Sequence, residues 1–293
     1  MNLGLHIAAT SWEGGASRIG ATLAEVVAAA EAAGFDAISV TDHVWGSEYT
    51  GGVESSQIEA YTTLGFIAAR TRRVRLLALA TAASFRHAGL LAKIVTTLDV
   101  LSGGRAMLGI GAGDYAEEAE GLGLPFPLAA ERFELLEETV RACLRMWTGE
   151  RGDGQPFHGK HVRMERALNV PQALSRPHPP VLIAGGGERR TLPLVARYAD
   201  ACNVPPTPEL PRKLELLKRL CDGAGRDYGA IEKTVPFAFD PGPDGAKVPE
   251  LLGQLRWLAG MGAQTVLGWV VGMERIGPLE VMGREVIPVV AEL

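Results

Sequence analysis

The sequence is poor in cysteine, has no long apolar run and carries no excess of positive charge. Its three cysteines, Cys143, Cys202 and Cys221, are odd in number and widely spaced. We therefore expect no disulfide framework, and we expect a reducing, cytoplasmic location. No stretch approaches the roughly 18 uncharged apolar residues that a membrane-spanning helix needs. The first residues also lack a positive segment followed by a long apolar core, so no signal peptide is predicted.

The charge argues against nucleic acid as the main partner. The formal net charge is −5, whereas a surface that follows a phosphate backbone normally makes a domain basic. Any anion-binding site must therefore be local, and a small-molecule substrate is expected. With 293 residues and 47% apolar content, the chain can bury a large core, as one big domain or two ordinary ones.

Apolar runs alternate with amphipathic segments along almost the whole chain. The runs predict eight strands, at 3–9, 36–43, 74–81, 105–113, 180–186, 201–204, 233–240 and 263–271. Helices are predicted at 21–33, 57–71, 88–101, 129–147, 189–199, 208–224, 247–260 and 276–292. Strands this apolar are covered on both faces, as in a parallel sheet. Eight such units favour an α/β fold of the closed (β/α)8 type, the TIM barrel, over an open doubly wound sheet.

One polar, glycine-rich stretch interrupts this alternation. It covers approximately 149–179, and the alternation resumes after it. We interpret it as an insertion that contains a β-hairpin, within a single barrel domain that spans residues 1–293.

Three consecutive glycines, residues 185–187, follow the fifth predicted strand and precede Arg189 and Arg190. In a barrel, functional sites lie at the carboxyl ends of the strands. Glycine lets backbone N–H groups approach a ligand, and a helix N-terminus adds free donors that suit a phosphate. Because Pro193 suits only a first helical turn, regular hydrogen bonding should begin near Thr191. The alternative is a tight turn with two solvated arginines.

Polar and aromatic residues also follow the second and fourth predicted strands. Asp42 and His43 could form an acid–base or hydrogen-bonding pair, since histidine titrates near neutral pH. Trp45 could wall a site for a planar ligand, and Asp114 follows the glycines of GIGAGD. The alternatives are an aspartate that caps its loop, a histidine packed beneath it, a tryptophan that anchors the loop and glycines needed only for packing.

Two stretches resemble nucleotide-binding motifs, but neither matches its motif fully. GIGAGD has Asp114 where a dinucleotide fingerprint needs its third glycine. GQPFHGKH, at 154–161, has His161 where a P-loop needs a hydroxyl, and it lies in the insertion. His158 and His161 have no cysteine or carboxylate set to complete a metal site, and HExxH and serine-nucleophile motifs are missing. No metal is predicted.

Several segments together resemble the luciferase-like oxidoreductases, and more narrowly the branch that uses coenzyme F420. They are the TDH after the second strand, SFRHAGLLAK, LDVLSGGRAMLGIGAG and, most specifically, GGGERRTLPLVARYADACN. The resemblance covers essentially the full chain and implies a TIM barrel with an insertion region. It also implies an oxidoreductase that transfers a hydride between C5 of the deazaflavin and a small organic substrate.

The resemblance implies a set of site residues. His43 and Asp114 would be catalytic, and a non-prolyl cis peptide is expected at Leu79–Ala80. Trp45 lies near the position of an active-site tryptophan, and the low polarity of the predicted rim, with Trp12 and Trp269, suits an apolar or conjugated substrate. The cofactor would contact Asp42, Leu79, Ala80, Ala82, Ala112, Gly113, Glu117, Gly185, Gly186, Gly187 and Arg189. The phosphate-binding lysines and arginine of F420-dependent sugar-phosphate dehydrogenases lack counterparts, so no sugar phosphate is predicted.

Two other functions stay open on the sequence. One is an FMN-dependent monooxygenase of the same family, because its flavin also needs a phosphate site. The other is a non-catalytic flavin-binding protein on the same barrel. A homodimer is expected because the family is often dimeric, with helices near 57–71 and 88–101 as interface candidates.

Overall fold

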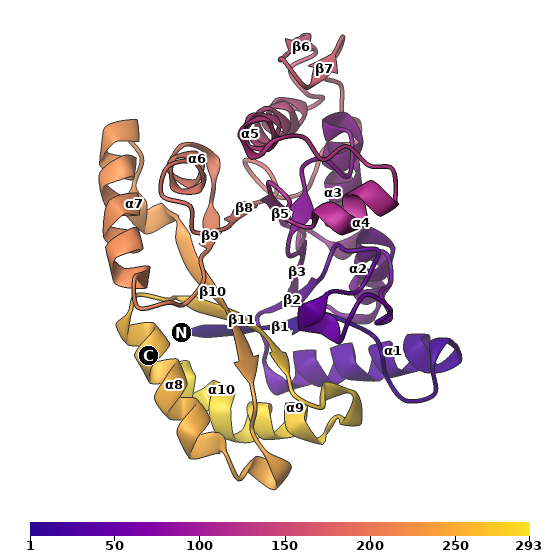
Figure 1. Cartoon of the computed structure of the whole chain (residues 1–293), viewed down its shortest axis with the longest axis vertical. Helices are drawn as coiled ribbons and strands as arrows, with labels where there is room; N and C mark the ends of the chain where they lie inside the picture. The colour runs from indigo at the N-terminus through magenta and orange to yellow at the C-terminus, as the bar shows by residue number, and fades with distance from the viewer.

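Nine parallel strands form a barrel in this computed structural model, which describes residues 1–293 apart from the side chain of Tyr49 (Figure 1). Their order is β3-β2-β1-β11-β10-β9-β8-β5-β4, and the ends meet where Leu76 pairs with Ala106. β3 and β4 follow one another as the third strand of the barrel, so the predicted eight-fold α/β barrel is confirmed. The strands are β1 (Asn2–Ile7), β2 (Ala37–Val40), β3 (Arg75–Ala78), β4 (Thr81–Ala82), β5 (Leu108–Gly111), β8 (Val181–Ala184), β9 (Ala201–Asn203), β10 (Glu232–Phe239) and β11 (Thr265–Val270).

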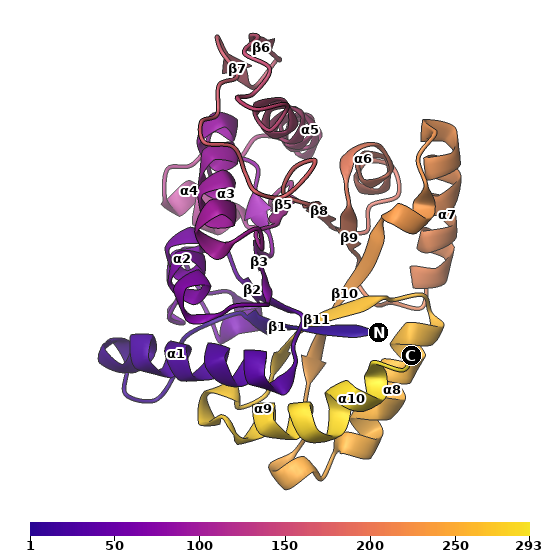
Figure 2. The same cartoon turned by 180° about the vertical axis from the view of Figure 1, so that it is seen from behind.

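Helices surround the barrel on its outside (Figures 1 and 2). They are α1 (Ala16–Ala33), α2 (Ala60–Arg70), α3 (Ala88–Ser102), α4 (Ala116–Gly121), α5 (Ala129–Met146), α6 (Thr191–Tyr198), α7 (Leu210–Ala224), α8 (Val248–Gly260), α9 (Gly277–Val281) and α10 (Ile287–Val290). None of these helices has the length and apolar content that crossing a bilayer requires. The short helix α4 falls in a segment where no helix was predicted. The single helix predicted at 276–292 is interrupted by a π-helical turn at Met282–Val286.

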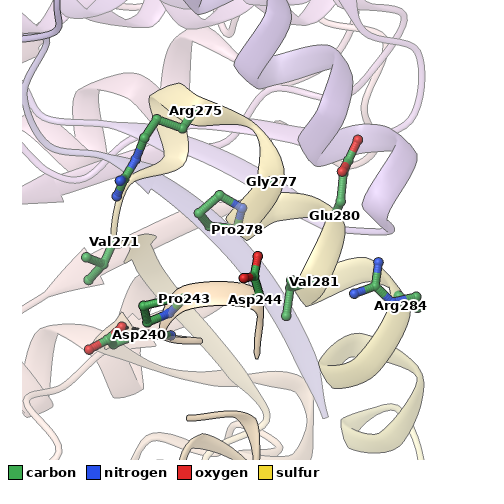
Figure 3. A pocket seen from close by; sticks show the side chains of 11 residues that line it. Asp240, Pro243, Asp244, Val271, Arg275, Gly277, Pro278, Glu280, Val281 and Arg284 are labelled. Atoms are coloured by element: carbon green, nitrogen blue, oxygen red, sulfur yellow. Dashed lines mark hydrogen bonds between the residues drawn. The ribbon is translucent and has the colours of Figure 1, made fainter. Parts of the chain in front are cut away.

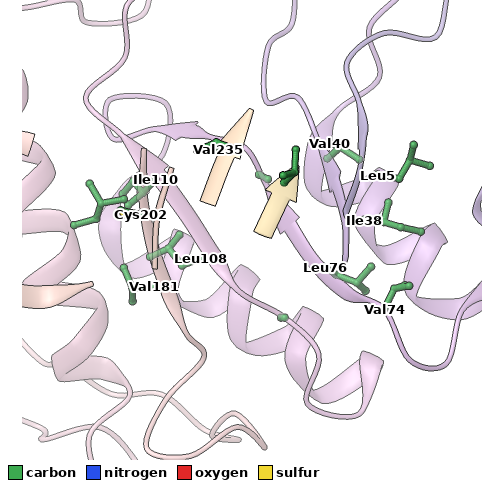
Figure 4. Packing of buried hydrophobic residues seen from close by; sticks show 14 of the residues in the cluster. Leu5, Ile38, Val40, Val74, Leu76, Leu108, Ile110, Val181, Cys202 and Val235 are labelled. Atoms are coloured by element: carbon green, nitrogen blue, oxygen red, sulfur yellow. The ribbon is translucent and has the colours of Figure 1, made fainter. Parts of the chain in front are cut away.

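Two apolar layers follow from the alternation of side chains along each strand. Outward-facing residues such as Leu5, Ile38 and Leu76 pack beneath the helices (Figure 4). Their neighbours face the inside of the barrel, where Leu77 and Leu182 belong to a second cluster. Successive residues of one strand thus enter different layers, which is why the strands are apolar almost throughout.

An ion cluster lies at the amino end of the barrel. Arg75 at the start of β3 donates to Asp36 at 2.8 Å and to Glu232 at 2.7 Å, although Glu232 begins β10. Thr265 also donates to Glu232. The amino end is therefore occupied by paired charges, and polar residues that could meet a ligand gather at the carboxyl end.

The insertion contains the predicted hairpin, which projects beyond α5 in Figure 1. Its strands are β6 (Phe157–His158) and β7 (Arg163–Met164), and they pair antiparallel. The turn between them wraps the Glu138 carboxylate of α5, which accepts bonds from the backbone N–H groups of Lys160, His161 and Val162, each at 2.8 Å. The amides of this P-loop-like segment are thus satisfied by the chain itself.

Candidate active site

A cavity of about 470 Å³ lies at the carboxyl ends of β2, β4, β5 and β8. Its walls bring together most of the residues predicted for the cofactor and for catalysis. These are Asp42, His43, Leu79, Ala80, Ala82, Ala112, Gly113, Asp114, Gly185, Gly186 and Gly187. Ser84, Phe126, Phe133 and Thr191 also line it, and none of them was predicted from the sequence. Ligand sites in proteins commonly have volumes of about 300–1,000 Å³, so this one is large enough for a cofactor ring system.

His43 is held by a buried carboxylate. Its Nδ1 lies 2.7 Å from Oε2 of Glu118, whose side chain is 0% exposed against 30% for His43. The other oxygen of Glu118 accepts from the backbone N–H groups of Val44 and Trp45, at 2.5 and 2.9 Å. Because the carboxylate accepts the Nδ1 proton, Nε2 of the neutral ring keeps its lone pair. Nε2 has no hydrogen-bond partner within the described part of the chain.

Sequence reasoning selected the neighbouring residue, Glu117, which is exposed and does not line this cavity. It borders an adjacent hollow together with His43 and Asp114. Consecutive residues of a helix point in directions about 100° apart, so only one of the two glutamates can face inward. In α4 that residue is Glu118. A helix predicted at 116–121 would have drawn attention to Glu118.

Asp42 is fully engaged by neighbouring side chains. Its Oδ2 accepts from Arg86 at 2.6 Å and from Thr81 at 2.7 Å, and its Oδ1 accepts from Arg86 at 3.0 Å. Burial by itself would lower the pKa of Arg86, but its hydrogen bonds and charge interaction with Asp42 raise that pKa above its ordinary value. Arg86 also pairs with Glu59. Asp42 therefore holds the loop that carries His43 in place. Arg86, which lies in the quoted SFRHAGLLAK segment, is another residue that was not predicted from the sequence.

The glycine loop lines the cavity, and two of its backbone amides have no partner in the described chain. Gly185 has a left-handed φ of +114°, and its N–H donates to the carbonyl of Asn203 at 2.8 Å. The N–H groups of Gly186 and Gly187 have no acceptor among the described residues. The helix that follows begins at Thr191, as predicted. The hydroxyl of Thr191 lies 3.0 Å from the position that a Cβ on Gly187 would take, so any side chain there would crowd the loop.

The rest of the cavity wall is largely apolar and contains one hydroxyl group without a hydrogen-bond partner, that of Ser84. Leu79 and Ala80 are joined by a cis peptide, as the resemblance implied. Phe126 and Phe133 add aromatic surface. Oγ of Ser84 is buried and has no partner within the described structure. A ligand with a flat apolar body, a polar edge and an anionic end matches this donor set and these walls.

Arg189 and the three tryptophans do not line this cavity. Arg189 is exposed on the turn before α6. The ring of Trp45 packs on α4, where a Cβ on Gly121 would lie 2.0 Å from it. Trp12 packs against the outer core cluster. Trp269, 41% exposed, lines a separate hollow of about 300 Å³ at the ends of β1 and β11.

A further cavity of about 510 Å³ lies beside the loops that follow β10 and β11 (Figure 3). Asp240, Pro243 and Asp244 come from the first loop. Val271, Arg275, Pro278, Glu280 and Arg284 come from the segment after β11. It contains no residue predicted for cofactor or catalysis. We place the candidate active site in the cavity of His43, because the free amides and the oriented imidazole meet there.

Comparison with known proteins identifies the family of this chain. A family model described as luciferase-like monooxygenase matches residues 1–270. The chain belongs to this family. The resemblance read from the sequence is therefore confirmed.

Relatives in the luciferase-like family extend the comparison. One, from Segniliparus rotundus, is named F420-dependent glucose-6-phosphate dehydrogenase and is 33% identical over 233 residues. The match covers 75% of this chain and 65% of that relative, so this chain spans somewhat less than two thirds of its length. A protein of the same name from Nakamurella multipartita is 34% identical over 61% of this chain and 50% of its own length.

Solved structures of this fold include enzymes with different titles. An F420-dependent secondary alcohol dehydrogenase in complex with an F420-acetone adduct superposes with a TM-score of 0.82 at 17% identity, covering 99% of this chain and 98% of that one. Monooxygenase RslO1 from Streptomyces bottropensis gives the same TM-score at 20% identity, covering 99% of both chains. At such identities the likeness shows the fold alone.

Proposed function

We propose that this chain is an F420-dependent oxidoreductase that transfers a hydride between the deazaflavin C5 and a small organic substrate. The observation that carries the proposal is one cavity lined both by a loop with free backbone amides and by an imidazole held by a buried carboxylate. Relatives that are 30–34% identical and named F420-dependent support F420 over FMN.

The residues of this chain would hold such a cofactor along the cavity. The amides of Gly186 and Gly187 and the Thr191 hydroxyl would bind its phosphate, and Arg189 would add positive charge from the surface. Leu79, Ala80, Ala82, Ala112 and Gly113 would pack on the ring, with the Ser84 hydroxyl available to a polar ring atom. When bound, F420 supplies a carbon that exchanges a hydride and reacts poorly with oxygen.

His43 would move a proton at the substrate. Its Nε2 is free, and the bond from Nδ1 to Glu118 fixes the ring and its tautomer. Asp114 lies on the same wall, exposed and without an ion-pair partner among the described residues, so it could serve as a second acid or base. Asp42 and Arg86 would keep the His43 loop in place.

The substrate would approach through the apolar rim. Ala80 and Ala82 line the main cavity, and Ala8, Met273 and Trp269 line the separate hollow at the ends of β1 and β11. This composition favours an apolar or conjugated substrate, with Trp12 and Trp45 as outer contacts. Unchanged steady-state rates after enlargement of Ala8 or truncation of Trp269, both of which line that hollow, would argue against this substrate class.

Titration of the purified protein with F420 and with FMN tests the choice of cofactor. We expect micromolar or tighter binding of F420 and much weaker binding of FMN. Submicromolar FMN with weak F420 would instead identify an FMN enzyme on the same barrel.

Substitution of His43 tests whether the chain is an enzyme. His43→Ala should lower kcat by about 100-fold, the usual size of a general acid–base contribution, while the Kd for F420 changes little. Glu118→Gln would keep the two backbone bonds but donate to Nδ1, which moves the ring proton to Nε2. We expect its pH profile of kcat to change, whereas the exposed control Glu120→Gln should behave as wild type. Cofactor binding without turnover in the wild-type protein would indicate a carrier.

A further inference from the structure

Lys213 lies against the glycine loop, although it belongs to a different element. It sits near the start of α7, and α7 and α6 lie side by side (Figure 1). Its Nζ is 3.1 Å from the position that a Cβ on Gly186 would take. A side chain on Gly186 would therefore displace this ammonium group, so glycine at this position lets Lys213 reach the loop.

Arg212 has a close ionic partner and Lys213 does not, although the charge of Lys213, after the hydrogen bonds from Arg212 and Thr207, helps to lower the pKa values of Glu188 and Glu209. Arg212, the preceding residue, pairs with Glu188 on the turn that follows the glycines. The carboxylate of Glu209 accepts a hydrogen bond from the Thr207 hydroxyl. Lys213 is half-buried, and its side chain has neither an ion pair within 4 Å nor a hydrogen bond with any described residue. The half-buried ammonium group of Lys213 is therefore available for direct contact with an anion at the loop.

We propose that Lys213 forms an ion pair with the cofactor phosphate that the Gly186 and Gly187 amides bind, an inference that rests on the proposed function. The amides contribute only partial charges, and Arg189 lies exposed outside the cavity. A phosphate at the loop would be within reach of the flexible lysine stem. The Arg212–Glu188 pair fixes the start of α7 against the loop, so it keeps Lys213 in position. The lysine would thus favour flavin-like cofactors with an anionic tail over those without one.

Equilibrium titration of purified variants tests this role without any assay of turnover. Lys213→Met keeps most of the stem and removes the charge, and Lys218→Met removes an exposed charge elsewhere on α7. Each protein is titrated with F420 and with the tail-less deazaflavin, which has the ring and ribityl chain but no phosphate. For Lys213→Met we expect about tenfold weaker binding of F420 and unchanged binding of the tail-less compound. Its F420 affinity should also depend less on salt than that of the wild type.

The outcomes separate the role of Lys213 from the choice of cofactor. Equal weakening of both deazaflavins would mean that Lys213 supports the fold of the loop, and an unchanged F420 affinity would mean that it makes no contact; either result overturns the proposal. If the wild type binds FMN instead of F420, the proposed function fails, and the same variants are compared on FMN and riboflavin with the same criteria. Lys213→Gln provides a second charge removal should Lys213→Met fold poorly by circular dichroism.

Discussion

The hairpin turn at 159–162 and the glycine loop at 185–187 each combine glycine with nearby basic residues, yet their backbone amides have different partners. In the hairpin, three consecutive N–H groups donate to Glu138, and Lys160 and His161 pair with Glu134. In the glycine loop, the N–H groups of Gly186 and Gly187 have no acceptor in the described chain. A cluster of backbone amides can bind an anionic ligand only where no carboxylate of the protein already accepts their hydrogen bonds. The glycine loop meets this condition, and the hairpin turn does not.

In the hairpin, the carboxylate of Glu138 takes the place that a bound anion would have at the glycine loop. Burial raises its pKa, but the backbone hydrogen bonds from Val162, His161 and Lys160 outweigh this effect and lower the pKa below its ordinary value. The carboxylate of Glu138 thus favours its charged form, which accepts the three hydrogen bonds of the turn. The corresponding charge at the glycine loop would come from a cofactor.

Glu138→Ala should have the largest effect on stability. It leaves three backbone N–H groups of the hairpin without their acceptor, so we expect the free energy of unfolding to fall by about 3 kcal/mol. Urea denaturation measures this, with Glu131→Ala on the same helix as the control. The Kd for F420 should not change, and a tenfold loss of cofactor affinity would contradict the separation of the two loops.

Gly185→Ala should weaken cofactor binding most. Its φ of +114° is unfavourable for alanine, so we expect the loop to shift and the Kd for F420 to rise about tenfold or more. Gly154→Ala is the matched control, because Gly154 also has a positive φ, +66°, and lies in the insertion. Both variants should lose about 1 kcal/mol of stability, but only Gly185→Ala should lose affinity. Equal Kd values for the two variants would show that the loop at 185–187 does not bind the cofactor.

Thr191→Val should have a smaller effect on binding. The substitution keeps the shape of the side chain and removes a hydroxyl that lines the cavity and has no partner in the described structure. We expect about fivefold weaker F420 binding, the size of one hydrogen bond of about 1 kcal/mol, with little change in Tm. A wild-type Kd for this variant would exclude the hydroxyl from the phosphate site.

Low pH should destabilise the hairpin at 157–164, and we expect this effect to be smaller than those of the three substitutions above. Hydrogen bonds from His161 and Lys160 lower the pKa of Glu134 to about 2 from an ordinary 4.5. Because the folded-state value is the lower one, this stabilisation is present above pH 4.5 and is lost as the pH falls toward 2. The protection factors for hydrogen exchange at 157–164 should therefore fall over that range more than those in the barrel. Glu134→Gln should remove this difference, and an unchanged difference would assign it to another group.

The fold could be predicted from the sequence because its signals are local. Alternating apolar runs gave the eight barrel strands within a few residues, and Pro193 placed the start of α6 at Thr191. The short helix α4 and the break in the last helix were not predicted. The break coincides with Gly283 packed directly on Ala33 of α1, a tertiary contact that no local pattern carries.

The candidate site could be predicted only in part. Residues at strand ends, such as His43 and Gly186, were found because a barrel gathers those ends at one rim. Glu118 and Arg86 were missed because their partners are distant in sequence; 75 residues separate His43 from Glu118. Lys213 was missed because it approaches the glycine loop from a different helix. The tryptophans were assigned to the rim by residue type, and none of the three lines the cavity of His43.

By itself the sequence determined the barrel, the position of its hairpin and the family resemblance, because apolar periodicity, glycine and proline act on the backbone over a few residues. Only the tertiary structure decided which carboxylate holds His43, which amides are already occupied and which lysine has no partner. Hydrogen bonds and ion pairs depend on distances of a few ångströms between residues far apart along the chain, and folding alone sets those distances.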